Sequence, residues 1–274
     1  MADDLSQSPA VLTNKTAVIC HWLLALLLAV AFALEIISLL GPLDFADQLH
    51  CAFILLATGS TLASLWRHLP LQNVLLAAFG IAVIGGGLTA LGAKTYLPFG
   101  PFIFGTAFGT LLFNTLPWAM PLVWVVVVLN SRGVARLILR PWRKNKTYGY
   151  RLIGLTAVLV LLFDIALDPF ASRVKHYWHW LPTTLPLNWQ GAALINFLAW
   201  ALITVLILLF ISPALIVKKP RSKRGADLHP LCLWLGGIIL FGTGSGIQAI
   251  WTPVFVDVAI GIVVLIFAIR GAMW

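Results

Sequence analysis

Residues 191–217 read GAALINFLAWALITVLILLFISPALIV, a stretch that contains no charged side chain. A helix needs about 20 apolar residues to cross the hydrocarbon layer of a bilayer, so this stretch is long enough to span a membrane. The whole chain has the same character, because 61% of its 274 residues are hydrophobic and only 10% are charged. Soluble domains carry about 25% charged residues. The sequence therefore predicts an integral membrane protein.

Similar hydrophobic stretches recur along the whole chain. The expected spans are residues 17–40, 49–66, 71–91, 113–130, 152–168, 191–217, 230–250 and 253–270. No soluble domain or low-complexity linker separates them, so we expect one integral membrane domain over residues 1–274. The predicted fold class is all-α, a polytopic transmembrane bundle of about eight helices.

The basic residues lie between these stretches rather than on a soluble face. The net charge is +9, and the basic residues concentrate in two blocks, at 132–151 and 218–224. Lysine and arginine beside membrane helices mark the cytoplasmic side. If the N-terminus is inside, eight spans place most of the 18 basic residues on that side. Both termini are therefore expected in the cytoplasm, and nucleic-acid binding does not explain the charge.

Two segments on the opposite side are unusual. Residues 92–112 are apolar but interrupted by prolines and glycines, and unpaired backbone cannot face lipid. We expect a re-entrant or interfacial segment packed on protein there. Residues 169–190 are rich in tryptophan and histidine and should form a second aromatic cover on the same side. The glycine run 85–87 lies inside a span, where close helix packing is a better interpretation than a phosphate-binding loop.

Four carboxylates lie in or at the end of hydrophobic stretches: Glu35, Asp164, Asp168 and Asp257. A charged side chain at the bilayer centre costs at least about 2.5–3.5 kcal/mol, so such residues are rare and usually functional. The predicted topology places all four toward the outer side. Asp164 and Asp168 are four residues apart and share one helix face. An apolar setting disfavours the charged form, so neighbouring acids there can share protons and act as an acid–base set.

Structural interpretations of these acids remain open. Asp168, followed by Pro169, is compatible with a helix end at which the carboxylate pairs with Arg173. Glu35 is compatible with a buried hydrogen-bonding partner. Asp257 is compatible with a cap at the start of the eighth helix, because acids favour helix N-termini.

Three histidines on the outer side are candidates for a proton relay or for metal ligands. His50 is near the outer mouth and is a candidate proton relay. His176 and His179 have the spacing of metal ligands but no matching second pair, so we predict no metal site.

The middle of the chain resembles the membrane-embedded carotenoid hydratases, a family that includes bacterial carotene 1′-hydratases and the bacterioruberin-pathway hydratase of haloarchaea. The resemblance covers roughly residues 90–200. It rests on the order and spacing of Leu97-Pro98-Phe99-Gly100, Pro117, Pro121-Leu122-Val123-Trp124, Asp164-x-x-x-Asp168-Pro169, Trp178-x-Trp180 and Asn196-Phe197-Leu198-Ala199-Trp200.

The chain departs from the family pattern at several positions. Phe102 and Phe104 stand where the family usually has tyrosines, and Ala193 and Ala199 where it tends to have proline and glycine. These departures indicate a divergent branch, in which the substrate and the preferred end group can differ.

The resemblance implies an enzyme of the hydro-lyase type that adds water across the terminal double bond of an acyclic carotenoid such as lycopene or γ-carotene. Protonation of that bond gives a tertiary cation, which water captures. A carotenoid is about as long as the ~30 Å hydrocarbon layer, so its end reaches the interface where the acids lie.

The resemblance also implies roles for individual residues. Asp164 or Asp168 is the expected proton donor with the other as its charge partner, and Glu35 is a water-orienting base or relay. The expected substrate-binding residues are Asn196, Trp178, Trp180, Phe99 and Phe102. No cofactor is implied. The expected setting is a bacterial inner membrane, in contact with lipid and in association with other carotenoid enzymes.

Other classes remain open. A membrane hydrolase of vinyl-ether lipids would use the same protonation chemistry. A small proton-coupled transporter would use the acids as a relay, but it predicts helix breaks in two repeated halves. A non-catalytic carotenoid-binding protein would keep the pocket and leave the pigment unchanged.

Overall fold

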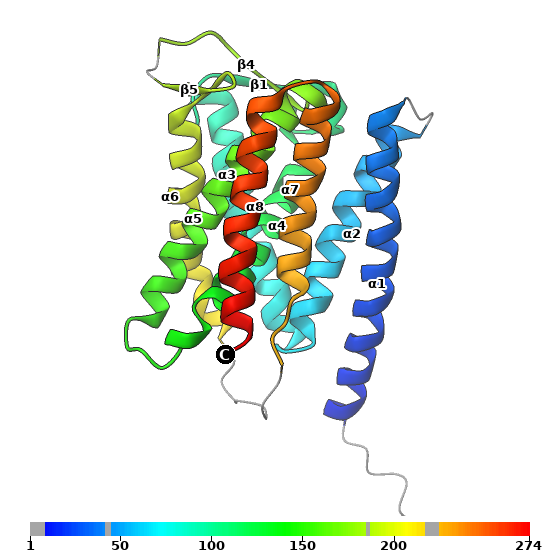
Figure 1. Cartoon of the computed structure of the whole chain (residues 1–274), viewed down its shortest axis with the longest axis vertical. Helices are drawn as coiled ribbons and strands as arrows, with labels where there is room; N and C mark the ends of the chain where they lie inside the picture. The colour runs from blue at the N-terminus through cyan, green and yellow to red at the C-terminus, as the bar shows by residue number, and fades with distance from the viewer. Residues whose placement is uncertain (1–8, 42–44, 185–186, 217–224) are drawn as a thin grey trace, which may run out of the picture.

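The computed structural model describes residues 9–41, 45–184, 187–216 and 225–274 and shows a helical bundle (Figure 1). Eight of its helices are long and apolar enough to cross a membrane, as the sequence predicts. They are α1 (Pro9–Leu40), α2 (Ala46–Trp66), α3 (Leu71–Thr95), α4 (Met120–Ile138), α5 (Tyr148–Pro169), α6 (Leu194–Ile211), α7 (His229–Ile247) and α8 (Trp251–Ala272). The predicted all-α bundle is confirmed.

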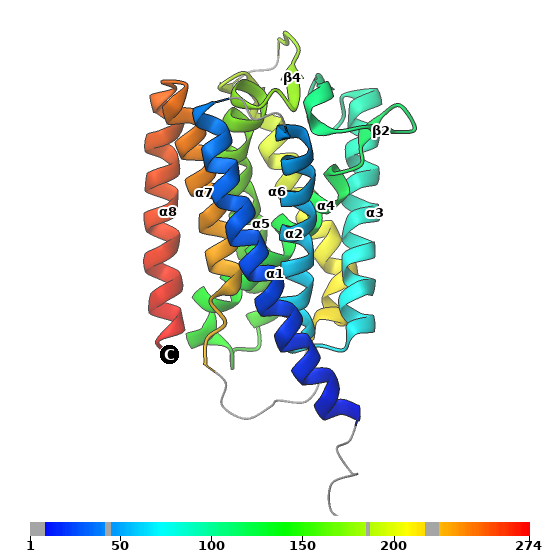
Figure 2. The ribbon, with the colours of Figure 1, turned by 90° about the vertical axis from the view of Figure 1, so that its right-hand side faces the viewer.

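The two ends of the bundle differ. Short strands lie at one end, which we call the cover end, and the last residue of α8 lies at the other, which we call the terminal end (Figure 1). Helix α1 also begins at the terminal end and packs mainly on α2, while α8 and α3 stand on opposite flanks (Figure 2). The basic block at 218–224 lies outside the described residues. The cytoplasmic location of the termini stays a prediction.

The fourth span differs from its predicted range of 113–130. Residues Leu111–Leu112 (β2) pair with Leu116–Pro117 (β3), and the turn between them has positive φ at Phe113 and Asn114. Helix α4 therefore starts only at Met120. It continues to Ile138, and Arg132 within it is buried and donates a hydrogen bond to the carbonyl of Leu215 at 3.3 Å. Hydropathy alone had placed that arginine in a loop.

The fifth span does not end at Asp168. Helix α5 runs through Pro169 and continues into a π-helical turn, η3 (Phe170–Val174). Arg173, which the structural interpretation paired with Asp168, donates instead to the carbonyl of Gln190 at 3.0 Å. Asp168 thus keeps its carboxylate inside the bundle.

The two predicted cover segments meet each other at the cover end. Strand β1 (Phe102–Phe104) pairs antiparallel with β4 (Trp178–Trp180), which places Phe102 opposite Trp180. A second pair joins β5 (Asn188–Trp189) and β6 (Ala192–Ala193) just before α6. The side chains of Phe99, Phe102 and Phe108 are buried. The first segment is therefore packed on protein, as expected.

The glycine run in α3 allows close contact with α4. A Cβ atom on Gly85 would lie 2.4 Å from Cγ of Trp124, and one on Gly86 would lie 2.9 Å from Cγ of Pro121. Contacts that short do not occur, so only glycine lets the two helices approach this closely. The packing interpretation is confirmed for Gly85 and Gly86, whereas a Cβ atom on Gly87 would meet nothing within 4 Å.

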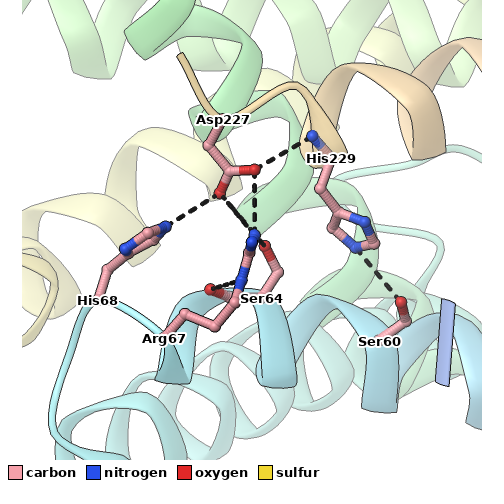
Figure 3. Close-up of polar contacts among 6 residues, drawn as sticks. All are labelled: Ser60, Ser64, Arg67, His68, Asp227 and His229. Atoms are coloured by element: carbon pink, nitrogen blue, oxygen red, sulfur yellow. Dashed lines mark hydrogen bonds and ion pairs between the residues drawn. The ribbon is translucent and has the colours of Figure 1, made fainter. Parts of the chain in front are cut away.

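A polar cluster joins α2 to α7 at the terminal end (Figure 3). Nη2 of Arg67 donates to both carboxylate oxygens of Asp227 at 3.1 Å, and Nε2 of His68 lies 3.3 Å from Oδ2. The backbone N–H of His229 donates to Oδ1 at 3.2 Å. Burial alone would raise the pKa of Asp227, but His68 and Arg67 hold that pKa below its ordinary value.

Replacing Asp227 by asparagine is expected to lower the melting temperature of the purified protein, because Arg67 loses its charged partner. We expect the free energy of unfolding to fall by about 1–2 kcal/mol, because charge-assisted hydrogen bonds contribute more to stability than exposed ion pairs do. The lowered pKa means that this stabilisation is present above the ordinary pKa of about 3.9 and is lost as the pH falls through the folded value. A melting temperature equal to that of the exposed control Arg270→Gln would contradict the assignment.

Candidate active site

A small pocket that is partly open to the surface lies at the cover end. It is lined by side chains from α3, α4, α6, β1, β4 and the turn before β1, namely Thr89, Phe99, Phe102, Phe104, Met120, Trp178, Trp180, Asn196 and Trp200. Six of these nine are aromatic, so the walls are mainly ring faces and edges. All five residues that the sequence analysis assigned to substrate binding line this one pocket.

Asp164 lies directly behind the polar wall of the pocket. Nδ2 of Asn196 donates a hydrogen bond to its Oδ2 at 2.8 Å. Asp164 is 1% exposed, and among the described residues Oδ1 has no hydrogen-bond partner. Asn196 comes from the first turn of α6, so the hydrogen bond joins α5 to α6 at the pocket.

Asp168 lies behind the indole wall, one turn farther along α5. Nε1 of Trp178 donates to Oδ1 of Asp168 at 2.9 Å, and Nε1 of Trp180 lies 3.0 Å from Oδ1 and 3.2 Å from Oδ2. Asp168 is fully buried. The pairing of β4 with β1 aims both indoles at this carboxylate, because alternate residues of a strand point to the same side.

The arrangement puts two carboxyl groups one hydrogen bond away from an aromatic pocket. Ring faces attract positive charge, and buried carboxyl groups in an apolar setting can hold or accept a proton. The site therefore suits a reaction in which an apolar substrate gains a proton and passes through a cation.

Sequence reasoning missed Thr89, Phe104, Met120 and Trp200 as pocket residues. Trp200 could have been found, because it lies four residues after Asn196 and so on the same face of the helix. No sequence spacing relates Thr89 or Met120 to the other pocket residues, because only tertiary packing brings their helices to the pocket.

Glu35 belongs to a different cluster at the same end of the bundle. Its Oε1 lies 2.5 Å from Nδ1 of His50, and Nζ of Lys175 lies 3.5 Å from its Oε2. Lys175 also donates to Oγ of Ser38 at 3.3 Å. Burial lowers the pKa of Lys175, and the charge of Glu35 opposes that shift. Glu35 is 2% exposed and is not among the residues that line the pocket.

Asp257 is separate from both groups. It lies six residues after the start of α8 and is 1% exposed, so the interpretation as a cap of that helix is wrong. A cap must reach the free N–H groups of the first turn, and Asp257 is beyond it. Gly242 on α7 faces it, and neither carboxylate oxygen has a hydrogen-bond partner in the described part of the chain.

His176 and His179 stack on each other, with ring centroids 5.6 Å apart. Nδ1 of His176 lies 3.2 Å from the carbonyl oxygen of Ser172. The pair therefore helps to hold the turn between η3 and β4.

Fold and site together define a multi-pass membrane protein with an aromatic pocket at one end of its helical bundle and buried acids behind that pocket. Residues 49–266 match the family model described as carotenoid biosynthesis protein. The chain belongs to this family. Helix α1, which carries Glu35, lies outside the matched region.

One curated relative is the bisanhydrobacterioruberin hydratase of Haloarcula japonica. The two proteins are 28% identical over 184 residues, which is 65% of this chain and 58% of the relative. The match therefore spans less than two thirds of the relative's length. No solved structure matches the chain.

Proposed function

We propose that this protein is a carotenoid hydratase that adds water across the terminal double bond of an acyclic carotenoid end group. The observation that carries the proposal is the position of Asp164 and Asp168 directly behind the aromatic pocket. The family, and a relative named as a hydratase, support the same chemistry.

The position of the pocket suits a long, rigid and apolar substrate. The pocket is lined in part by the cover-end strands β1 and β4, and the eight helices are each long enough to cross the hydrocarbon layer. A carotenoid that lies along the bundle would place one end group at this depth, close to interfacial water. The long polyene would stay in lipid, so a small pocket is sufficient.

In the proposed reaction, the carboxyl group of Asp168 gives its proton to the less substituted carbon of the terminal double bond. The other carbon becomes a tertiary cation. Water then bonds to that carbon and loses a proton, which returns to the carboxylate. The sum is the addition of one water molecule, and the enzyme ends in its starting protonation state. A positioned acid of this kind contributes about 10²–10⁴-fold to a rate.

The neighbouring side chains have supporting roles in this proposal. Asn196 holds the attacking water, and Asp164 holds Asn196 in place through the 2.8 Å hydrogen bond. Phe99, Phe102 and Trp178 present ring faces or edges to the cation. Trp180 lies between Asp168 and the pocket, so its indole must shift when the end group enters. Hydrogen bonds in an empty site often rearrange when substrate binds.

We assign Glu35 a supporting role away from the reacting atoms. Its contacts with His50 and Lys175 tie α1 and α2 to the end of η3, seven residues after Asp168. A relay of protons from the outer surface through His50 fits the same geometry. We place both termini in the cytoplasm and the protein in a bacterial inner membrane, near other enzymes that process the same pigments.

The experiment is pigment analysis of cells that make lycopene or γ-carotene, with and without this chain. The proposed function predicts a tertiary alcohol that is heavier than the starting pigment by one water. Pigment that co-purifies with the protein but keeps its mass would indicate a carotenoid-binding protein. Proton-dependent uptake into vesicles without any change in the pigment would indicate a transporter.

Replacing Glu35 by glutamine is expected to lower the stability more than the activity. Loss of one partner from a buried ion pair costs roughly 3 kcal/mol, so the melting temperature should fall clearly. The yield of hydrated pigment at matched protein levels should fall less than about 10-fold, below the range for loss of an acid catalyst. A loss of activity as large as that of Asp168→Asn would instead place Glu35 in the chemistry.

A further inference from the structure

Trp200 forms the deep wall of the pocket. It lies one helical turn after Asn196 on α6, which begins at the cover end, so it stands deeper in the bundle than the proposed water-holding amide. Its side chain is 3% exposed. Asn196 and Trp200 therefore line the pocket at two successive depths.

Trp200 is backed by a second indole. The rings of Trp200 and Trp124 stack with centroids 3.9 Å apart and an interplanar angle of 19°. Trp124 is completely buried. Because it lies behind Trp200, the wall can retreat only if Trp124 also moves.

Trp124 is fixed by one turn of α3. Its Nε1 donates to Oγ1 of Thr89 at 2.9 Å, and the same hydroxyl donates to the carbonyl of Gly85 at 2.8 Å. The hydroxyl of Thr89 thus accepts one hydrogen bond and donates another, and the two bonds together set its orientation. Gly85 has no Cβ atom, and that space is filled by the ring of Trp124. Interiors packed this closely do not give way by small displacements.

We infer that Trp200, supported by Trp124, Thr89 and Gly85, is the specificity determinant that limits the pocket to slim, acyclic end groups. The inference rests on the proposed function for the identity of the ligand. A linear isoprenoid end can pass beside Asn196 until it touches the wall. A cyclised end is wider and would need the space that the two indoles occupy. Trp200 acts by contact and Gly85 acts through Trp124, while Thr89 lines the pocket and also positions Trp124 through its hydrogen bond.

The test measures pigment retention, which does not depend on catalysis. The full-length protein is purified in detergent from cells that make lycopene or from cells that make β-carotene, whose two ends are both cyclised. Absorbance gives the pigment bound per protein. We expect the wild type to retain at least about 10-fold more acyclic pigment, counted as lycopene plus its hydrated product, than β-carotene, a size discrimination typical of apolar pockets. Trp200→Leu should bring this ratio close to one.

A second route leaves Trp200 itself unchanged. Thr89→Val removes the acceptor for Trp124 without a large change of volume, and it should also lower the ratio. Thr89→Ser restores the hydroxyl and should restore the wild-type ratio. A general loss of packing would not be rescued in this way. Trp251→Leu, at an exposed tryptophan, is the matched control and should behave as wild type.

The outcomes separate this inference from the proposed function. If the wild type retains lycopene selectively but never hydrates it, the proposed function fails and the role of Trp200 stands. If neither Trp200→Leu nor Thr89→Val changes the ratio in folded protein, the role of Trp200 is overturned. Equal retention of both pigments by the wild type also overturns it.

Discussion

Cells that make lycopene and carry the Asp168→Asn variant are expected to contain at least about 100-fold less tertiary alcohol than cells with the wild type. Asparagine keeps the shape of the side chain and can still accept from Trp178 and Trp180, but it cannot give a proton to carbon. The loss should fall in the range for a positioned general acid, about 10²–10⁴-fold. The measurement is the ratio of hydrated to unchanged pigment at matched protein levels.

Asp257→Asn is the matched control for this prediction. Asp257 is a buried aspartate toward the same end of the bundle, and it is not among the pocket residues. Its replacement should leave the hydrated fraction within about 2-fold of the wild type if the expressed protein is folded. Unchanged hydration by Asp168→Asn, or equal losses in both variants, would remove Asp168 from the role of donor.

Asn196→Leu is expected to reduce the yield of hydrated pigment by about 10- to 100-fold. A misplacement of a reacting group by about 1 Å can cost that much in rate, and here the attacking water would be misplaced. The variant removes the amide that we assign to the attacking water. It also leaves Oδ2 of Asp164 without its donor, which costs about 1–3 kcal/mol in a buried site. Both hydration and the melting temperature should therefore fall.

A double variant separates these two effects. Asp164→Leu combined with Asn196→Leu removes both partners, so no unpaired group remains and most of the stability should return. Hydration should stay low, because the amide is still missing. Asn130→Leu is the control, since Asn130 is a buried asparagine that bonds to Thr61 and Val126 and does not line the pocket. Recovery of hydration in the double variant would contradict the role of Asn196.

Much of the fold follows from hydropathy. Long uncharged stretches can satisfy their backbone groups in lipid only as helices, so all eight spans were predictable. The range of α4 was not, because hydropathy cannot distinguish the paired strands at residues 111–117 from the start of a helix. The burial of Arg132 was equally hidden, since its acceptor is the carbonyl of Leu215 on another helix.

The site was predictable only in part. Phe99, Phe102, Trp178, Trp180 and Asn196 were grouped by a resemblance, and the structure places them around one pocket. The position of Glu35 was not accessible, because its partner Lys175 is 140 residues away in the sequence. Depth in the membrane indicated that the four acids lie at one end, but depth alone does not show which of them face each other. Trp200, Trp124 and Thr89 lie on three different helices, so no local sequence pattern reveals that Trp124 and Thr89 support Trp200.

The most direct test of the central claim uses purified wild-type protein in lipid vesicles that contain lycopene, in heavy water. The account predicts a tertiary alcohol that carries one deuterium on the carbon next to the alcohol carbon, because the acid delivers a solvent-derived proton there. An alcohol with no deuterium on that carbon, or pigment that stays bound but unchanged, would contradict it.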